Sequence, residues 1–203
     1  MSISGDLVGP MINIRITIFD AAALFSVFAG YTWQNETRWL PSYSLRLNYL
    51  YGLSSDATSN VEQFSLPQFE NYQAQYEVQS QMLLGVFKLD LYRYKRLSPF
   101  ISAGLGVAWN RFSDYDEQAF AGITPRVNPN FEDKTHANLA YTLGAGFDFL
   151  LTDKFSLSLE YDYGYLGHVK SGESAISPGD NLDSKLSTNM VLLNIVYLLG
   201  EDS

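Results

Sequence analysis

The clearest signal in the sequence is a strict alternation of apolar and polar residues in the last third of the chain. From Ala137 to Phe149 every second residue is apolar, and the residues between them are small or polar. After a short polar interruption the alternation resumes from Phe155 to Tyr165. A period of two is the period of a β-strand, whose side chains point alternately to the two faces of a sheet. The sequence therefore predicts two antiparallel strands joined by a tight turn at 151–154.

The length of these strands and the chemistry of their faces favour a membrane protein. Each alternating stretch runs for about ten residues or more, which suffices for a tilted strand to cross a bilayer, whereas soluble strands usually end after about five or six. One face carries large aromatic and aliphatic residues, and the other carries Gly, Ser, Thr and carboxylates. Lipid accepts apolar side chains and requires every backbone polar group to be paired within a closed ring. These faces predict a transmembrane β-barrel with bulky apolar residues outside and small or polar residues inside.

The same alternation recurs elsewhere in the chain and predicts an all-β fold, an eight-stranded antiparallel up-and-down transmembrane β-barrel. The further stretches are 11–19, 25–34, 43–51, 76–92, 99–110 and 191–199. We expect one barrel domain over 11–199, between an N-terminal tail at 1–10 and a C-terminal tail at 200–203.

The first stretch admits a second interpretation, because a secretion signal could begin at Met11. Asp20 interrupts the apolar run that such a signal needs, so we expect a strand there and no signal peptide in this chain. The link to the second strand, 20–22, is as short as a turn where an outer loop is expected.

The connections between the predicted strands alternate in length. The short ones are 35–40, 93–98 and 151–154, and the long ones are 54–73, 112–134 and 169–186. Bacterial outer-membrane barrels place short turns in the periplasm and long loops outside, so we expect both chain ends in the periplasm. The long loops carry formal charges of -3, -3 and -1, which is -7 of the total of -9. Such loops fit simple solvation and a cation-binding or adhesive surface equally well.

Composition adds limits to this prediction. Cysteine is absent, which excludes disulfides and thiolate metal sites, and no apolar run is long enough for a membrane-spanning helix. The 14 tyrosines and 13 phenylalanines suit the aromatic girdles of a barrel. A net charge of -9 argues against a nucleic-acid partner.

Three segments resemble the small outer-membrane β-barrel proteins of Gram-negative bacteria, the family of the OmpA transmembrane domain, OmpX and the opacity-type surface antigens. They are SPFISAGLGVAW at 98–109, LGAGFD at 143–148 and SLSLEYDY at 156–163, the last followed by Gly167. The resemblance covers about 100 of the 203 residues and implies the fold and a bacterial outer-membrane location, with lipid and lipopolysaccharide as surroundings. It says little about activity. The family usually ends on an aromatic residue, whereas here Tyr197-Leu-Leu is followed by Gly-Glu-Asp-Ser203.

Charged residues on the predicted inner face are the main candidate site. They are Arg15, Arg46, Lys88, Asp90, Asp148, Glu160 and Asp162. They could line a conduction path or compensate one another. The interior of an eight-stranded barrel is just wide enough for side chains to fill, and buried charges must be paired. The pattern therefore favours a structural charge network, with inward glycines such as Gly104 and Gly144 leaving room for long side chains.

The two histidines, His136 and His168, are the only candidates for catalysis, since some outer-membrane barrels hydrolyse lipid with a His-Ser pair. Asn138 rather than serine neighbours His136 on the same face, and Ser171 would face away from His168 in an extended chain. We therefore expect no catalytic, cofactor or metal site.

The sequence thus favours a non-enzymatic barrel with a structural or surface-recognition role carried by the long loops, which could contact an extracellular ligand or a host surface. Three alternatives remain: a narrow pore for ions or small solutes, a lipid-modifying barrel enzyme, and a soluble lipocalin-like carrier. The carrier would need bulky apolar residues on the face predicted to point inward.

Overall fold

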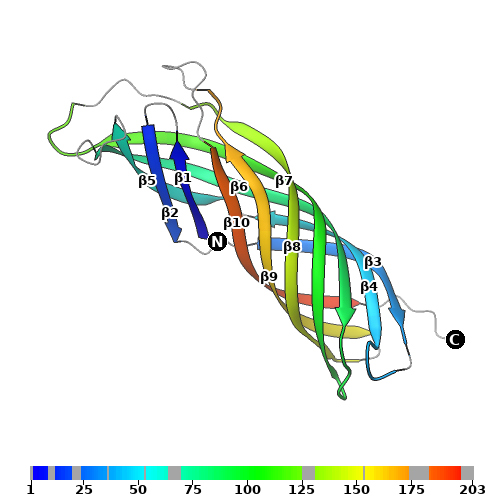
Figure 1. Ribbon diagram of the computed structural model, residues 1–203. Helices are drawn as coiled ribbons and strands as arrows, with labels where there is room; N and C mark the ends of the chain where they lie inside the picture. Colours follow the sequence, from blue (N-terminus) through cyan, green and yellow to red (C-terminus); the bar gives the residue numbers. More distant parts are fainter. Residues whose placement is uncertain are drawn as a thin grey trace.

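The computed structural model describes residues 2–8, 12–19, 24–35, 37–52, 54–63, 70–124, 131–152, 154–173 and 183–197. Within these ranges, ten strands form a single antiparallel sheet that curls around itself as an elongated half-barrel (Figure 1). The strands are β1 (Ser2–Val8), β2 (Ile12–Phe19), β3 (Leu24–Gln34), β4 (Ser42–Gly52), β5 (Ser55–Gln63), β6 (Glu70–Asp90), β7 (Leu97–Ala119), β8 (Lys134–Leu150), β9 (Phe155–Lys170) and β10 (Asp183–Tyr197).

In each of the eight stretches predicted from the sequence, the described residues lie largely on a strand, and the predicted antiparallel up-and-down barrel fold is confirmed. From β6 to β10 each strand pairs with the next one along the chain. β6 is long enough to border two strands in succession, β5 along its first half and β4 along its second half. In Figure 1, β1, β2 and β5 therefore lie together at one end of the molecule, and β3 and β4 lie toward the other.

The pairing of the first predicted strand differs from the expectation. The alternation predicts that 11–19 and 25–34 form a hairpin, whereas β2 pairs with β1 on one side and β5 on the other, and β3 pairs with β4. The segment 1–10, expected to be a tail, contributes β1. β1 and β2 are close in sequence, and closing a short loop costs little entropy. The predicted C-terminal tail, 200–203, lies outside the described residues.

The predicted long loops are also shorter than expected, because the strands continue into them. The segment 54–73 holds β5 and the start of β6, and β7 continues to Ala119. β9 runs to Lys170, and β10 begins at Asp183. The outward residues of these continuations are polar, since they include Gln75, Arg111 and Asp116. A prediction based on apolar outward faces assigns such residues to loops, although they lie on strands and face water.

We call this part of the sheet, made of β1, β2, β5 and the loop-side ends of β6 to β10, the loop-side extension. The opposite end, with the three short connections, is the turn end.

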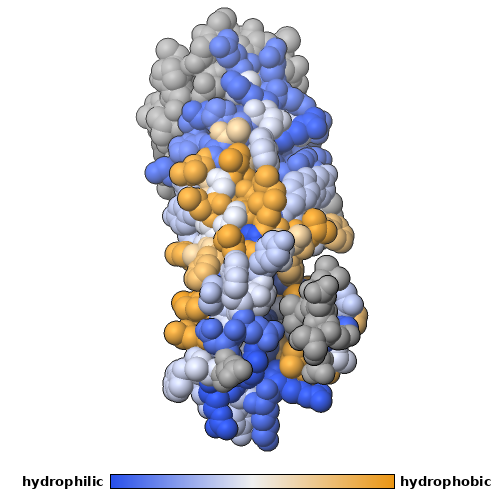
Figure 2. Space-filling view, turned by 90° about the vertical axis from the view of Figure 1, so that its right-hand side faces the viewer, coloured by the Kyte–Doolittle hydropathy of each residue, from blue (hydrophilic) through white to orange (hydrophobic). Residues whose placement is uncertain are grey.

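An apolar band surrounds the sheet between these two ends. Figure 2 shows apolar residues gathered across the middle of the face in view, between hydrophilic residues above and below. Val191, Leu139 and Val27 are 73%, 69% and 68% exposed, and most of the other residues predicted to face lipid on β3, β4 and β6 to β10 are exposed as well, whereas a few such as Trp109 are half-buried. A contiguous exposed apolar surface of this kind marks contact with a membrane. No helix among the described residues is long and apolar enough to cross a membrane.

Aromatic side chains pair at the margins of the apolar band. Trp33 and Tyr43 stack with ring centroids 5.2 Å apart toward the turn end, and Tyr141 and Tyr165 stack at 5.3 Å farther toward the loop side. Amphipathic rings favour the boundary between lipid and water. These pairs therefore agree with the membrane position that the apolar band indicates.

Candidate functional site

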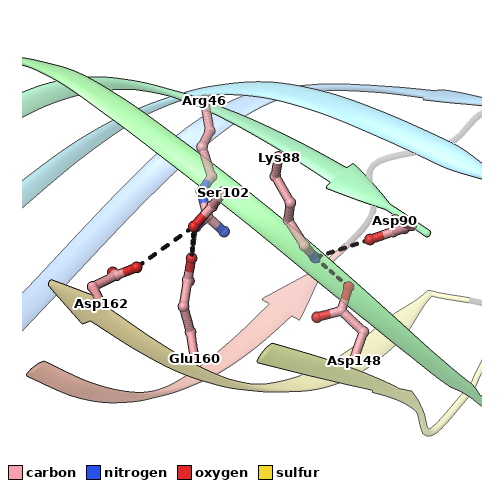
Figure 3. A network of polar contacts seen from close by, with 7 residues as sticks. All are labelled: Arg46, Lys88, Asp90, Ser102, Asp148, Glu160 and Asp162. Carbon is pink, nitrogen blue, oxygen red and sulfur yellow. Dashed lines mark hydrogen bonds and ion pairs between the residues drawn. The ribbon is translucent and has the colours of Figure 1, made fainter. Parts of the chain in front are cut away.

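Charged side chains meet on the inner face of the sheet in the half nearer the turn end (Figure 3). Arg46 of β4 donates from its Nη2 to both carboxylate oxygens of Glu160 on β9, at 2.9 and 2.8 Å. The Ser102 hydroxyl of β7 donates to Glu160 at 2.7 Å and lies 3.5 Å from a carboxylate oxygen of Asp162. Arg46 and Glu160 are only 7% and 1% exposed, so this pair is excluded from water.

A second cluster surrounds Lys88 of β6. Its ammonium group forms an ion pair with Asp148 of β8 and lies 3.6 Å from Asp90. Asp90 also accepts a hydrogen bond from Ser42. The Lys88 ammonium sits 4.0 Å from the centroid of the Phe100 ring, a distance at which the ring face attracts a cation. Hydrogen bonds and a ring therefore compensate the buried lysine on several sides.

Glycines on the inner face make room for these contacts. A Cβ on Gly144 would collide with Asp162 and would lie 2.5 Å from the Ser102 hydroxyl. A Cβ on Gly146 would lie 2.6 Å from the Phe100 ring. These positions therefore need glycine so that side chains from neighbouring strands can meet over the sheet.

All six inward charges from Arg46 to Asp162 named in the sequence analysis lie in these two clusters. The alternation predicted their inward direction, but their partners are far apart in sequence. Arg46 and Glu160 are separated by 114 residues, and Lys88 and Asp148 by 60. The side chain of Arg15 lies outside the described part of the chain. No group of three metal-ligating side chains occurs among the described residues.

The loop-side half of the interior is largely apolar, which was not expected from the sequence. Aromatic rings of β6, β7 and the segment before β8 pack there, with Tyr76 5.0 Å from Phe112 and Phe131 edge-on to Tyr115 at 5.0 Å. Aliphatic residues continue this packing, and all are buried: Leu50, Val78, Met82, Leu84, Leu166, Val169, Leu186, Met190 and Leu192. A small or polar inner face therefore describes most of the turn half, whereas in the loop-side half polar residues such as Ser80 and Asn110 are buried among large apolar ones.

A signal for this apolar interior is present in the sequence. Tyr76, Val78, Met82, Leu84 and Val86 all lie at even positions of β6, on the face that also carries Lys88. The outward residues in the first part of this segment, Gln75, Glu77, Gln79 and Gln81, are polar, so its alternation there is inverted relative to the lipid-facing strands. Burial of Tyr76 raises the pKa of its hydroxyl, which has no hydrogen-bond partner. The Tyr76 side chain is therefore neutral and can pack among the neighbouring aromatic rings.

The two histidines lie near the loop side. His168 Nδ1 is 2.6 Å from Asp183 Oδ1, and Lys170 Nζ is 3.0 Å from Asp183 Oδ2. Burial alone would raise the pKa of Asp183, but hydrogen bonds from His168 and Lys170 outweigh it and lower that pKa. The Ser171 hydroxyl donates to the Gly172 carbonyl oxygen at 2.8 Å. The His136 carbonyl oxygen accepts from Asn138 at 3.3 Å.

Comparisons with known proteins identify the fold family and nothing narrower. No curated protein and no solved structure matches the chain. The family model described as outer membrane protein beta-barrel domain matches residues 16–197, which includes both charged clusters and the apolar interior. The chain therefore belongs to the outer membrane protein β-barrel domain family and is a transmembrane β-barrel of the outer membrane.

Proposed function

We propose that this protein is a non-conducting, non-enzymatic barrel whose loop-side extension provides a structural or surface-recognition role. The observation that carries this proposal is the filled interior. Charged clusters occupy the turn half, and packed aromatic and aliphatic side chains occupy the loop-side half. A solute would have to break the Arg46–Glu160 pair and then cross a layer of buried rings.

The energetics of the interior indicate that its side chains block the passage of solutes, and we call these side chains the plug. Removing one partner of a buried ion pair leaves an uncompensated charge, which typically costs about 3–5 kcal/mol. Displacing packed rings and methyl groups also creates cavities, which destabilise in proportion to their volume. An ion would therefore meet an electrostatic barrier followed by an apolar one.

The loop-side extension is the surface that remains for a function. In this extension the loop-side ends of β6 to β10 continue beyond the apolar band, and outward residues described there, such as Gln75, Arg111 and Asp116, are polar. Its described carboxylates outnumber its described cations; the carboxylates include Asp56, Glu77, Asp114, Asp116, Glu117, Glu132, Asp133, Glu173 and Asp183, and the cations are Arg111, Lys134, Lys170 and Lys185. Rigid strands that present charged side chains are a suitable scaffold for recognition. In this proposal the extension faces the cell exterior, among lipopolysaccharide, and meets an extracellular ligand or host surface.

Bilayer recordings of the refolded full chain test the plug. We expect conductance near zero for the wild type and measurable leakage for Arg46→Ala, because the mutation leaves Glu160 without its cation. Arg111→Ala is the matched control, since Arg111 also pairs with a carboxylate, Asp133 at 3.2 Å, but lies on the surface. Steady, ion-selective wild-type conductance, with Arg46→Ala altering selectivity alone, would instead identify a narrow pore.

The recognition role needs a separate experiment. Substituting Asp56, Asp114 and Asp116 together by asparagine removes three exposed carboxylates of the loop-side extension and leaves the apolar band, the buried rings and both charged clusters intact. We expect bacteria that display this variant to lose surface adhesion while the barrel still folds and resists extraction. Unchanged adhesion of these cells would restrict the protein to a structural role.

A further inference from the structure

The three short connections at the turn end differ in charge. The connection 93–98 carries Arg93, Lys95 and Arg96 and no carboxylate, whereas 35–40 and 151–154 each carry one acidic and one basic residue. Two carboxylates lie near the ends of this turn, Asp90 along the chain and Asp148 opposite Ser98 on β8, and both point into the interior and pair with Lys88. The turn between β6 and β7 therefore concentrates positive charge on a strongly acidic protein, and no described carboxylate pairs with it.

A pocket of about 370 Å³ lies beside this turn, lined by Tyr94, Lys95, Arg96, Leu97 and Phe149. Its wall is almost entirely apolar. Leu97 and Phe149 are paired neighbours on β7 and β8, and they are 40% and 43% exposed. Both side chains belong to the edge of the apolar band, so the pocket opens where lipid meets water.

The backbone holds the two cations in place at this edge. Tyr94 and Leu97 exchange hydrogen bonds of 2.9 and 3.0 Å across the turn, and the Arg96 carbonyl oxygen accepts one from Leu150 at 2.8 Å. Lys95 has a φ of 54°, a left-handed conformation that a side-chain-bearing residue adopts at some cost. Neither Lys95 nor Arg96 forms an ion pair with a described residue; the Lys95 ammonium lies 5.5 Å from the centroid of the Tyr94 ring.

We propose that this pocket binds one anionic phospholipid of the leaflet that meets the turn end. The phosphate would be held by Lys95 and Arg96, and an acyl chain would lie along Leu97 and Phe149. Arginine and lysine are the side chains that recognise phosphate, and basic residues at a membrane surface attract anionic lipid. The apolar wall and its continuity with the apolar band select a lipid over free phosphate, which would gain nothing from that wall.

Native mass spectrometry of the full chain in detergent tests this site, with phosphatidylglycerol and phosphatidylcholine as probes. We expect the wild type to retain one phosphatidylglycerol in preference to phosphatidylcholine. The double substitution Lys95→Gln/Arg96→Gln removes both charges and keeps side chains of similar length. We expect it to weaken phosphatidylglycerol binding about 30-fold, from two lost charges at the membrane surface.

Two controls decide between a site and general attraction. Lys134→Gln/Lys185→Gln removes the same charge from exposed residues on the loop side and should leave binding unchanged. Arg38→Gln/Arg93→Gln removes two charges at the turn end outside the pocket and should reduce binding only slightly. Equal loss in all three variants, equal retention of the two lipids by the wild type, or competition by inorganic phosphate at equal concentration would each overturn the proposal. Heat-dependent gel mobility verifies that every variant is folded.

Discussion

At the scale of single residues, the stability of the barrel interior depends on how deeply a charged side chain is buried and on where glycine leaves space for its neighbours. Arg46 and Arg111 each pair with one carboxylate, yet Arg46 is 7% exposed and Arg111 is 54% exposed. Exposed ion pairs are screened by water and contribute little, whereas a buried charge that loses its partner is strongly unfavourable. The same residue type therefore has different consequences in the two places.

We expect Arg46→Ala to lower the free energy of unfolding by about 3 kcal/mol, because Glu160 would remain buried without its cation. Arg111→Ala should lower it by less than about 1 kcal/mol. Urea unfolding in lipid vesicles, followed by tryptophan fluorescence, measures both changes. A similar small change for both variants would show that water reaches Glu160.

Gly144 tests the close approach of side chains over the sheet. Gly144→Ala should destabilise the barrel by about 1–3 kcal/mol, since its Cβ would collide with Asp162 and crowd Ser102. Gly85 provides a control on the outer face, because a Cβ there would lie 3.8 Å from its nearest neighbour, the Leu105 carbonyl oxygen. Thermal unfolding of the two variants should therefore differ clearly, and equal midpoints would contradict the crowded geometry.

At the scale of strands, the height of a residue along the strand matters as much as its face. Leu159 and Thr135 both point outward and are exposed, but Leu159 lies within the apolar band and Thr135 lies in the loop-side extension. Lipid surrounds the first and water the second. Whether an outward residue is apolar or polar therefore depends on whether lipid or water surrounds it, and not on which strand it belongs to.

We expect Leu159→Arg to cost about 2–4 kcal/mol, the range measured for arginine near the bilayer midplane. Thr135→Arg should cost close to nothing, because that position is outside the membrane. The folded fraction after refolding into vesicles, read from heat-dependent gel mobility, measures both effects. Equal tolerance of the two substitutions would contradict the position assigned to the apolar band.

The loop-side end of the β9–β10 hairpin should weaken at low pH. The pKa of Asp183 is lowered from 3.8 in the folded protein, where His168 and Lys170 bond to the carboxylate. A lowered pKa means that the stabilisation is complete above the unfolded value and is lost as pH falls through the folded value. Hydrogen exchange of amides near Asp183 should therefore lose protection below about pH 4, after correction for intrinsic rates. Asp183→Asn should remove this pH dependence while preserving the size of the side chain.

At the scale of the whole molecule, three zones follow one another along the barrel. The turn end carries exposed basic residues, the apolar band follows, and the acidic loop-side extension lies beyond it. The interior changes in parallel, from paired charges to packed rings. This arrangement explains how a chain with a net charge of -9 can present a local positive surface to a membrane leaflet.

The positions of the strands that cross the apolar band, and the direction of their side chains, were determined by the sequence alone. Alternation with a period of two is local, and lipid on one side forces every second residue to be apolar, so the pattern remains legible without any partner strand. For that reason the outward row on β10 and the inward direction of Arg46 and Lys88 could be predicted. The glycine positions on the inner face followed from the same pattern.

Only the tertiary structure decided which strands pair and which charges meet. β2 pairs with β1 and β5 rather than with β3, and Arg46 meets Glu160 rather than Asp148. The local alternation is the same whichever strand lies alongside, so it does not select these partners. Alternation determines which face of the sheet a side chain points to. It does not determine which strand lies alongside or how far along the barrel the residue lies. A strand that leaves the membrane keeps its period and exchanges its outward residues for polar ones. Because of that exchange, the loop-side extension was predicted as loops and the apolar half of the interior was not predicted.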